Sequence, residues 1–415
     1  MTSTGKAAPA ALEGLRVLDL SGPMGNYTGK LFADMGADVV LVEPPGGTQL
    51  RREPPFIGDV AGVERSLNFA YQNTSKRGIC LDLDTASGQQ LFRDLAATAD
   101  LVIETFAPGW MDARGIGYET LARRRTSICM ASITPFGQTG PYAQMQATDL
   151  VGLAMGGLLH MGGYRDAAPT QAHGDQAFKC AAMYGGVAAM LAVTDAELTG
   201  QGQHVDISMQ ESVTLALENA AQTYDLEGVI RQRPLGDQRF AGYGLFECKD
   251  GYIFLGSRGI GNSPAWSRSM QWFKDEGMVG AERLLGPEWS DLEYLKGDEA
   301  RDVFAELFMN WSRQHTKAWL YSEGQKRGIP LAPVSTPADL LENPQLQARG
   351  HFVPFTHPLL EQAASMPGAP YVMSGTPWQV RRPAPALGEH TVEVLNEIGV
   401  ARDEVSRLVS MGVAA

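Results

Sequence analysis

The stretch PTQAHGDQAFKCAAMYGG, residues 169–186, places a single carboxylate at the start of an apolar helix. Two kinds of chemistry are open to Asp175. As an N-cap residue, it would accept hydrogen bonds from the N–H groups of the first helical turn. As an ionised carboxylate, stabilised by the positive end of the helix, it could instead attack an acyl carbon. Caps far outnumber nucleophiles, so the stretch by itself favours the cap. Gly174, which has no side chain, would leave room for a ligand beside the carboxylate.

Short apolar runs and helical stretches alternate along the first 150 residues and position this carboxylate. The pattern predicts strands over 16–21, 37–45, 78–84, 100–106 and 127–134, and helices over 29–36 and 86–99. A further strand is predicted later in the chain, over 204–209. Such alternation is typical of an α/β fold with a parallel sheet and helices on both faces. In sheets of this kind, ligands bind beside the carboxyl ends of the strands.

Glycines and basic pairs follow several of these strands. The glycines after the first strand, Gly22, Gly25 and Gly29, do not have the GxGxxG spacing of a dinucleotide site, so a NAD enzyme is disfavoured. Clusters at Arg51–Arg52, Lys76–Arg77 and Arg123–Arg125 could hold phosphates. A solvated basic face is the ordinary interpretation of such clusters.

Length, net charge and the spacing of cysteines and histidines exclude several classes of protein. The chain has 415 residues, which favours two domains, and its net charge of −13 argues against a nucleic-acid partner. We expect no secretory signal and no membrane span, because no apolar run reaches the ~18 residues that a span needs. The four cysteines form no CxxC pair and the histidines form no HxxxH or HExxH motif. We therefore expect reduced thiols, a cytoplasmic location and no metal site.

The pattern of predicted elements changes after residue 225. We expect a large domain over 1–225, a smaller α+β domain over 226–330, and a C-terminal part, 331–415, that returns to the large domain. Within the smaller domain, GYGLFECKDGYIFLGS (242–257) alternates like a hairpin with its turn at Lys249–Gly251. Near the C-terminus, GEHTVEVLNEIG and RDEVSRLVSMG predict two amphipathic helices.

Several stretches, in this order and spacing, resemble the class III CoA-transferases of the CaiB/BaiF type, the family of formyl-CoA and carnitine CoA-transferases. The resemblance runs from about residue 12 to residue 413. The stretches that carry it are LEGLRVLDLSG, LFADMGADVVLVEPPGG, NTSKRGICLDL, ADLVIETFAPGWMDARGIGYETL, PFGQTGPYA, LTGQGQHVDISMQES, IPLAPVSTPADLLENPQLQARGHF and ALGEHTVEVLNEIG.

The resemblance implies a Rossmann-like large domain, two interlocked chains, and coenzyme A bound across the carboxyl ends of the strands. It also reverses the assignment of Asp175, which falls on the family's nucleophile. The reaction it implies moves CoA from an acyl-CoA to a carboxylic acid through aspartyl anhydride and aspartyl-CoA thioester intermediates, without a metal. By the same resemblance, a glycine loop over the active site would lie at 256–264. The resemblance places Leu81, Thr105, Phe106 and Arg114 at the coenzyme A site, and Gly256, Gly259 and Gly261 in the loop. Gly22 after the first strand and the basic residues Arg51 and Lys76 are expected to contact coenzyme A as well.

Three positions depart from the family's pattern. Lys179 replaces a small residue four positions after the nucleophile. At this spacing the lysine could lower the reactivity of Asp175, bind a substrate carboxylate, or point to solvent, and we expect the last. Thr105 stands where the family has a CoA-contacting asparagine. Arg114 lies one residue beyond a family arginine, at whose position this chain has Ala113. The CoA contacts are therefore expected to be rearranged.

Two other functions remain open. The α-methylacyl-CoA racemases share the fold and the aspartate, but they need a histidine at the position of Thr148, and threonine cannot serve as a general base. A non-catalytic subunit of a heteromeric transferase is the second alternative. The expected assembly is thus a homodimer, or a heteromer with a paralogous subunit. The sequence does not identify the donor and acceptor acids.

Overall fold

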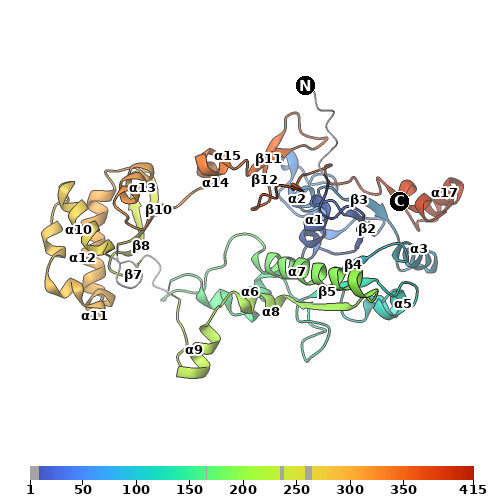
Figure 1. Cartoon of the computed structure of the whole chain (residues 1–415), viewed down its shortest axis with the longest axis horizontal. Coiled ribbons are helices and arrows are strands. Elements are labelled where there is room, and N and C mark those ends of the chain that lie inside the picture. The colour runs from blue at the N-terminus through green and yellow to red at the C-terminus, as the bar shows by residue number, and fades with distance from the viewer. Residues whose placement is uncertain (1–8, 165, 234–237, 258–263) are drawn as a thin grey trace. The chain divides into compact units, whose positions relative to one another are not determined.

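The computed structural model describes residues 9–164, 166–233, 238–257 and 264–415 (Figure 1). The described chain divides into two compact units. The first comprises residues 1–159, 172–221 and 348–415, and the second comprises 160–171 and 222–347. The ribbon of the C-terminal helices, drawn in red, lies beside the blue N-terminal strands of the first unit (Figure 1). This unit is therefore built from both ends of the chain.

A parallel sheet forms the centre of the first unit. Within the described residues, its strands are β1 (Arg16–Asp19), β2 (Asp38–Glu43), β3 (Arg77–Cys80), β4 (Leu101–Glu104), β5 (Cys129–Thr134) and β6 (His204–Ser208). Their spatial order is β3-β2-β1-β4-β5-β6, and every pairing is parallel. The inner strands are buried almost throughout, which explains their continuous apolar runs. The order reverses between β1 and β4, as in doubly wound folds.

Helices cover both faces of this sheet, as the sequence predicts. One core packs α3 (Ala86–Ala96), α16 (Thr391–Glu397) and α17 (Arg402–Ser410) against it. The other core packs α1 (Asn26–Asp34), α7 (Gln176–Thr199) and α8 (Met209–Leu215). The remaining elements of this unit are α2 (Leu67–Gln72), α4 (Trp110–Ala113), α5 (Tyr118–Ala122), α6 (Asp149–Met155), and the β11 (Phe352–Phe355) and β12 (Ala364–Pro367) hairpin.

The second unit is smaller and mixed in type. Its antiparallel sheet has the order β10-β9-β8-β7, with β7 (Gln238–Phe240), β8 (Tyr243–Cys248), β9 (Gly251–Gly256) and β10 (Leu331–Pro333). The expected hairpin over 242–257 is confirmed as β8 and β9. Aromatic side chains fill its core, which α10 (Ala265–Asp275), α12 (Asp298–Ser312) and α13 (Lys317–Lys326) supply. Shorter helices are α9 (Ala220–Glu227), α11 (Leu292–Lys296), α14 (Pro337–Glu342) and α15 (Pro344–Ala348).

The α/β fold class expected from the sequence is confirmed. The apolar helix expected after Asp175 is α7, which is long and apolar enough to cross a membrane by length and composition alone. Its residues Ala177, Ala181 and Ala189 are buried against the sheet, so it packs as the core helix of a globular unit. The cysteines are free thiols; Cys180 is half-buried and the other three are buried. The cytoplasmic location stays a prediction.

Candidate active site

The loops after β1 and β4 lie side by side where the strand order reverses. The Gly22 N–H donates a hydrogen bond to Thr105 Oγ1 over 2.8 Å. Gly25 must be small, because a Cβ there would lie 2.8 Å from the Thr105 methyl group. The structure therefore brings Gly22 and Thr105 together at the topological switch point, the place where open α/β sheets bind ligands.

A flat stack of side chains follows the end of β4. The rings of Phe106 and Trp110 are parallel within 14°, with centroids 3.9 Å apart. The Arg114 guanidinium lies over the Trp110 ring, with its Cζ 3.7 Å from the ring centroid. The Arg114 Nε donates a hydrogen bond to Asp84 Oδ1. The Phe106 N–H donates to Glu104 Oε2 over 2.6 Å. Phe106 and Arg114, both expected at the site from the resemblance, thus stack on Trp110, which was not expected there.

Asp175 occupies the N-cap position of α7, but its carboxylate makes no capping hydrogen bond. Gly174 before it has a φ of +77°, a left-handed conformation that favours glycine. The acceptor for the first turn of α7 comes from α6 instead, since the Phe178 N–H donates to Asp149 Oδ1 over 3.0 Å. Asp175 lies at the start of the helix, as predicted, but the capping hydrogen bond is absent. The carboxylate of Asp175 is consequently not used to cap the start of α7.

Asp149 is buried, with 6% of its surface exposed. Burial raises the pKa of Asp149, and the charge of Asp175 raises it further, whereas the hydrogen bond from the Phe178 amide and the charge of Lys179 lower it. Asp149 and Asp175 therefore interact electrostatically at the start of α7. Asp149 was not among the site residues expected from the sequence. Its position at the first turn of its own helix gave no sign that it caps another.

Lys179 does not point to solvent, so that expectation is wrong. The side chain is half-buried and its Nζ lies 4.8 Å from the centroid of the Tyr27 ring, on α1. Burial lowers the pKa of Lys179 to about 8, against the charges of Asp175 and Asp149, which raise it. The ring contact follows from how the helices pack, because α1 and α7 lie in contact and start at the same end of the sheet.

The contact between α1 and α7 is close because small residues line it. Thr28 Oγ1 donates to the Ala182 carbonyl over 2.8 Å, and a Cβ on Gly185 would lie 2.7 Å from the side chain of Ile133 on β5. Tyr27 and Lys179 meet at one end of this contact. The N-termini of two helices thus lie together near the carboxyl end of β1, where backbone N–H groups favour an anionic ligand.

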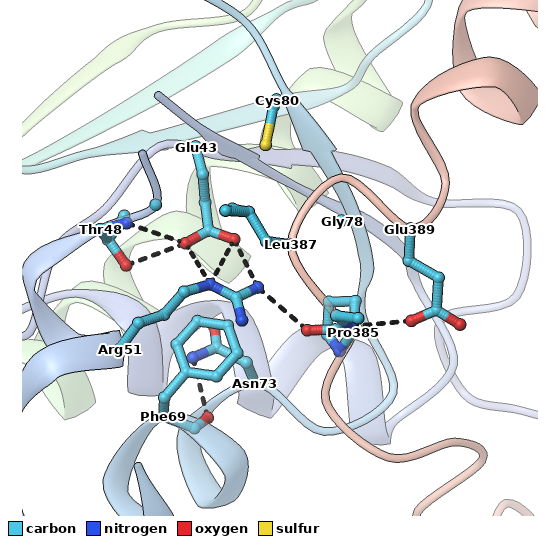
Figure 2. Close-up of polar contacts among 12 residues, drawn as sticks. Glu43, Thr48, Arg51, Phe69, Asn73, Gly78, Cys80, Pro385, Leu387 and Glu389 are labelled. Atoms are coloured by element: carbon cyan, nitrogen blue, oxygen red, sulfur yellow. Dashed lines mark hydrogen bonds and ion pairs between the residues drawn. The ribbon is translucent and has the colours of Figure 1, made fainter. Parts of the chain in front are cut away.

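Arg51 lies inside the first unit. Its guanidinium is fully buried, donates to both carboxylate oxygens of Glu43, with the shortest contact 2.7 Å, and donates to the Pro385 carbonyl over 3.0 Å (Figure 2). The Phe69 ring lies 3.8 Å from its Cζ. These contacts tie the C-terminal segment to the N-terminal sheet. They favour a structural role over the expected contact with CoA.

Lys76 is also fully buried. Its ammonium donates to Asp19 Oδ2 over 2.6 Å, and to the Asn26 carbonyl and Asn73 Oδ1, each over 2.8 Å. All three N–H donors of Lys76 are thereby used. The geometry favours a positioning role, since the bond to Asn26 fixes the first residue of α1.

The contacts of Leu81 and Gly256 are those of the fold itself. Leu81 is buried after β3 and pairs with Ala414 in an isolated bridge, which is the packing of a core residue. Gly256 ends β9 in the second unit, and its N–H donates to the Pro330 carbonyl. Gly259 and Gly261 lie outside the described residues. Within the described ranges, no group of three or more His, Cys, Asp or Glu residues could hold a metal ion.

Glu53 was missed by the sequence analysis. Burial raises its pKa, and the charge of Asp175 raises it further, so the two carboxylates lie within electrostatic reach of each other. Its position in the loop after β2 was a usable signal, because loops at the carboxyl ends of strands line ligand sites. Around Asp175 the chain therefore places two other carboxylates, Glu53 and Asp149, and one ammonium, Lys179.

Comparisons with known proteins agree with this geometry. The model of the family described as CoA-transferase family III matches residues 12–391. The BbsE subunit of succinyl-CoA:(R)-benzylsuccinate CoA-transferase from Thauera aromatica is 39% identical over 398 residues, which cover 96% of each chain. Succinate–glutarate CoA-transferase from Agrobacterium fabrum is 31% identical, over 93% of this chain and 95% of its own. The crystal structure of a CaiB/BaiF family protein from Brucella suis superposes with a TM-score of 0.82 at 29% identity, covering 94% of this chain and 99% of that one.

Proposed function

The chain belongs to CoA-transferase family III, and from that premise we propose that it moves CoA from a dicarboxylic acyl-CoA to a carboxylic acid with Asp175 as the nucleophile. The observation that carries the proposal is the uncapped carboxylate of Asp175 at the start of α7, where Asp149 serves as the acceptor for the helix. The donor class follows from the relatives, several of which are named for succinyl-CoA.

The reaction proceeds in balanced steps. A carboxylate oxygen of Asp175 attacks the thioester carbonyl, the C–S bond breaks, and CoA thiolate leaves a mixed anhydride. The thiolate then attacks the aspartyl carbonyl, which releases the donor acid and leaves an aspartyl-CoA thioester. The acceptor carboxylate attacks that thioester, forms a second anhydride and frees the thiolate. Attack of the thiolate on the acceptor's acyl carbon gives the new acyl-CoA and restores Asp175.

Each tetrahedral intermediate carries an oxyanion that needs hydrogen-bond donors. Backbone N–H groups at the neighbouring starts of α1 and α7 are suited to this role. The Phe106–Trp110–Arg114 platform supports a place for the adenine ring of CoA, because aromatic and guanidinium planes stack on bases. Gly22 and Thr105, at the switch point, would approach the rest of the nucleotide. The proposed loop over the site contains Gly256, Gly259 and Gly261.

The assembly is part of the proposal. We infer an interlocked dimer of chains, each with a large domain over 1–225 and 331–415 and a small domain over 226–330. The BbsE relative is named as a subunit, and two further relatives are the alpha and beta subunits of succinyl-CoA–L-malate CoA-transferase from Chloroflexus aurantiacus. A heteromer with a paralogous subunit is therefore the alternative to a homodimer. The racemase alternative gains no support, because Thr148 at the N-cap of α6 has no acid–base group.

The test compares wild type with Asp175→Asn and Asp175→Ala. Exchange of labelled acid into succinyl-CoA, read by mass spectrometry, should fall by at least ~10³-fold in both variants, because no other group replaces the nucleophile. Circular dichroism and thermal unfolding should remain close to those of wild type, since Asp175 makes no capping bond. Exchange at the wild-type rate in Asp175→Ala would refute the nucleophile assignment.

A further inference from the structure

Lys179 differs from the neighbouring lysines Lys30 and Lys76 in making no hydrogen bond or ion pair within the described part of the chain. Lys30 donates to Asp34 over 2.7 Å, and Lys76 donates to Asp19 over 2.6 Å. Among the described residues, no hydrogen bond or ion pair is found for the ammonium of Lys179, although the side chain is half-buried. Burying a cation without a partner is costly, so a position of this kind points to a charge supplied from outside the chain.

The Tyr27 ring holds Lys179 in place without using its hydrogen-bond donors. The ammonium lies 4.8 Å from the ring centroid, a cation–π distance, and the ring is itself stacked near Tyr71 with centroids 6.3 Å apart. A cation–π contact orients the side chain through the ring face. It leaves the N–H groups of the ammonium available to a carboxylate.

Lys179 lies one helical turn beyond Asp175, a separation along α7 comparable with the length of a short diacid. The two residues are four positions apart on α7, a separation that puts them on one side of the helix with a rise of ~6 Å. A saturated chain of four or five carbons spans roughly 4–5 Å between its carboxyl carbons, given C–C bonds near 1.5 Å. One carboxyl carbon can therefore meet Asp175 while the other carboxylate reaches the ammonium.

The surrounding charges make a cation necessary for such a substrate. Asp175, Asp149 and Glu53 would together repel a free carboxylate that entered beside them. Lys30 and Lys76 are already neutralised by their own partners. Resting on the function proposed above, we infer that Lys179 is a specificity-determining residue that binds the second, unactivated carboxylate of a dicarboxylic substrate and so selects diacids over monoacids.

The experiment measures kcat/KM for two acceptor acids of equal carbon number, succinate and butyrate, with succinyl-CoA as donor. The protein is used with any subunit that co-purifies with it. The variants are Lys179→Met, which keeps length and removes the charge, and Lys179→Arg, which keeps the charge. The control is Lys326→Met, an exposed lysine on α13 in the second unit, paired with Glu323.

In Lys179→Met, the preference for succinate over butyrate should fall ~10- to 100-fold, the range expected for a lost charge-assisted hydrogen bond. Lys179→Arg should retain most of the preference, and Lys326→Met should retain all of it. An equal fall for both acids would overturn the inference, because it would place the effect of Lys179 on Asp175 itself. An unchanged preference would also overturn it.

The donor half-reaction separates the two proposals. Formation of aspartyl-CoA from succinyl-CoA in wild type tests the proposed function alone, since it needs no acceptor. If the adduct is absent from wild type, the proposed function fails and the inference about Lys179 fails with it. If the adduct forms and the acid preference does not depend on residue 179, only the inference is refuted.

Discussion

Removing the acceptor that Asp149 provides to α7 should weaken both the fold and the reaction. In Asp149→Ala the Phe178 N–H loses its 3.0 Å hydrogen bond in a site that is 6% exposed. A lost helix cap costs about 1 kcal/mol. Leaving the buried N–H unpaired adds about 1–2 kcal/mol. We therefore expect the free energy of unfolding to fall by about 2–3 kcal/mol.

Asp149→Asn is the matched variant, because its amide oxygen still accepts the Phe178 N–H but carries no charge. It should lose about 1 kcal/mol or less, the difference between a charged and a neutral acceptor. Burial and the charge of Asp175 raise the pKa of Asp149 above its unfolded value, which also limits the loss. The raised pKa means that wild type loses stability relative to Asn as the pH rises through the folded pKa.

Urea denaturation at pH 7 measures both differences, and the rate of aspartyl-CoA formation measures the effect on Asp175. We expect Ala to slow adduct formation more than Asn, since only Ala frees the first turn of α7 and with it the nucleophile. Equal stabilities of the Ala and Asn variants would refute the reasoning. So would a rate of adduct formation that is unchanged by Asp149→Ala.

Three further predictions concern buried or stacked groups. Burial raises the pKa of Glu104 from 4.5 to about 7, so its stabilising contribution is complete below pH 4.5 and is lost as the pH rises through about 7. Relative to Glu104→Gln, wild type should lose about 3 kcal/mol across this range in denaturant titrations, and parallel pH profiles would contradict this. Lys76→Met should lower the free energy of unfolding by about 3–5 kcal/mol, and Lys296→Met, at an exposed pair, by less than about 1; equal losses would contradict the buried network. Trp110→Ala should raise KM for acyl-CoA roughly tenfold or more with little change in kcat, and an unchanged KM would place the adenine elsewhere.

The sequence predicted most of the fold because its strands are short apolar runs. The expected stretch 100–106 contains the buried strand Leu101–Glu104, and 127–134 contains Cys129–Thr134. Strand ends were less predictable. The run 78–84 continues past Cys80, where pairing with β2 stops and Leu81 bridges to Ala414 instead. Such long-range pairings leave no local signal.

The start of α7 was predicted from the sequence, but the contacts around it were not. The glycine before Asp175 and the apolar run after it located the helix start correctly. The residue that accepts a hydrogen bond from the first turn of α7 is Asp149. It lies 29 residues from Phe178 in sequence, so the local pattern could not identify it. The orientation of Lys179 was wrong for the same reason, because Tyr27 comes from a distant helix.

The basic residues show the same limit. Charge alone made Arg51 and Lys76 candidates for phosphate contacts. Their partners Glu43 and Asp19 lie 8 and 57 residues away, and the sequence contains many acidic residues at comparable distances. Only packing shows that these cations are buried. The sequence named Phe106 and Arg114 as CoA contacts, but it gave no sign of their stacking through Trp110.

The most direct test of the central claim follows one oxygen atom. When the acceptor acid carries heavy oxygen in its carboxylate, the second anhydride retains that atom as its bridge, and cleavage at the acceptor's acyl carbon leaves it on the aspartate. Trypsin should release residues 166–179, which contain Asp166 and Asp175, and fragmentation distinguishes the two. The account predicts one heavy oxygen on Asp175 after a single turnover, up to two after repeated turnover, and none on Asp166. Completed turnover with no heavy oxygen on Asp175 would contradict it.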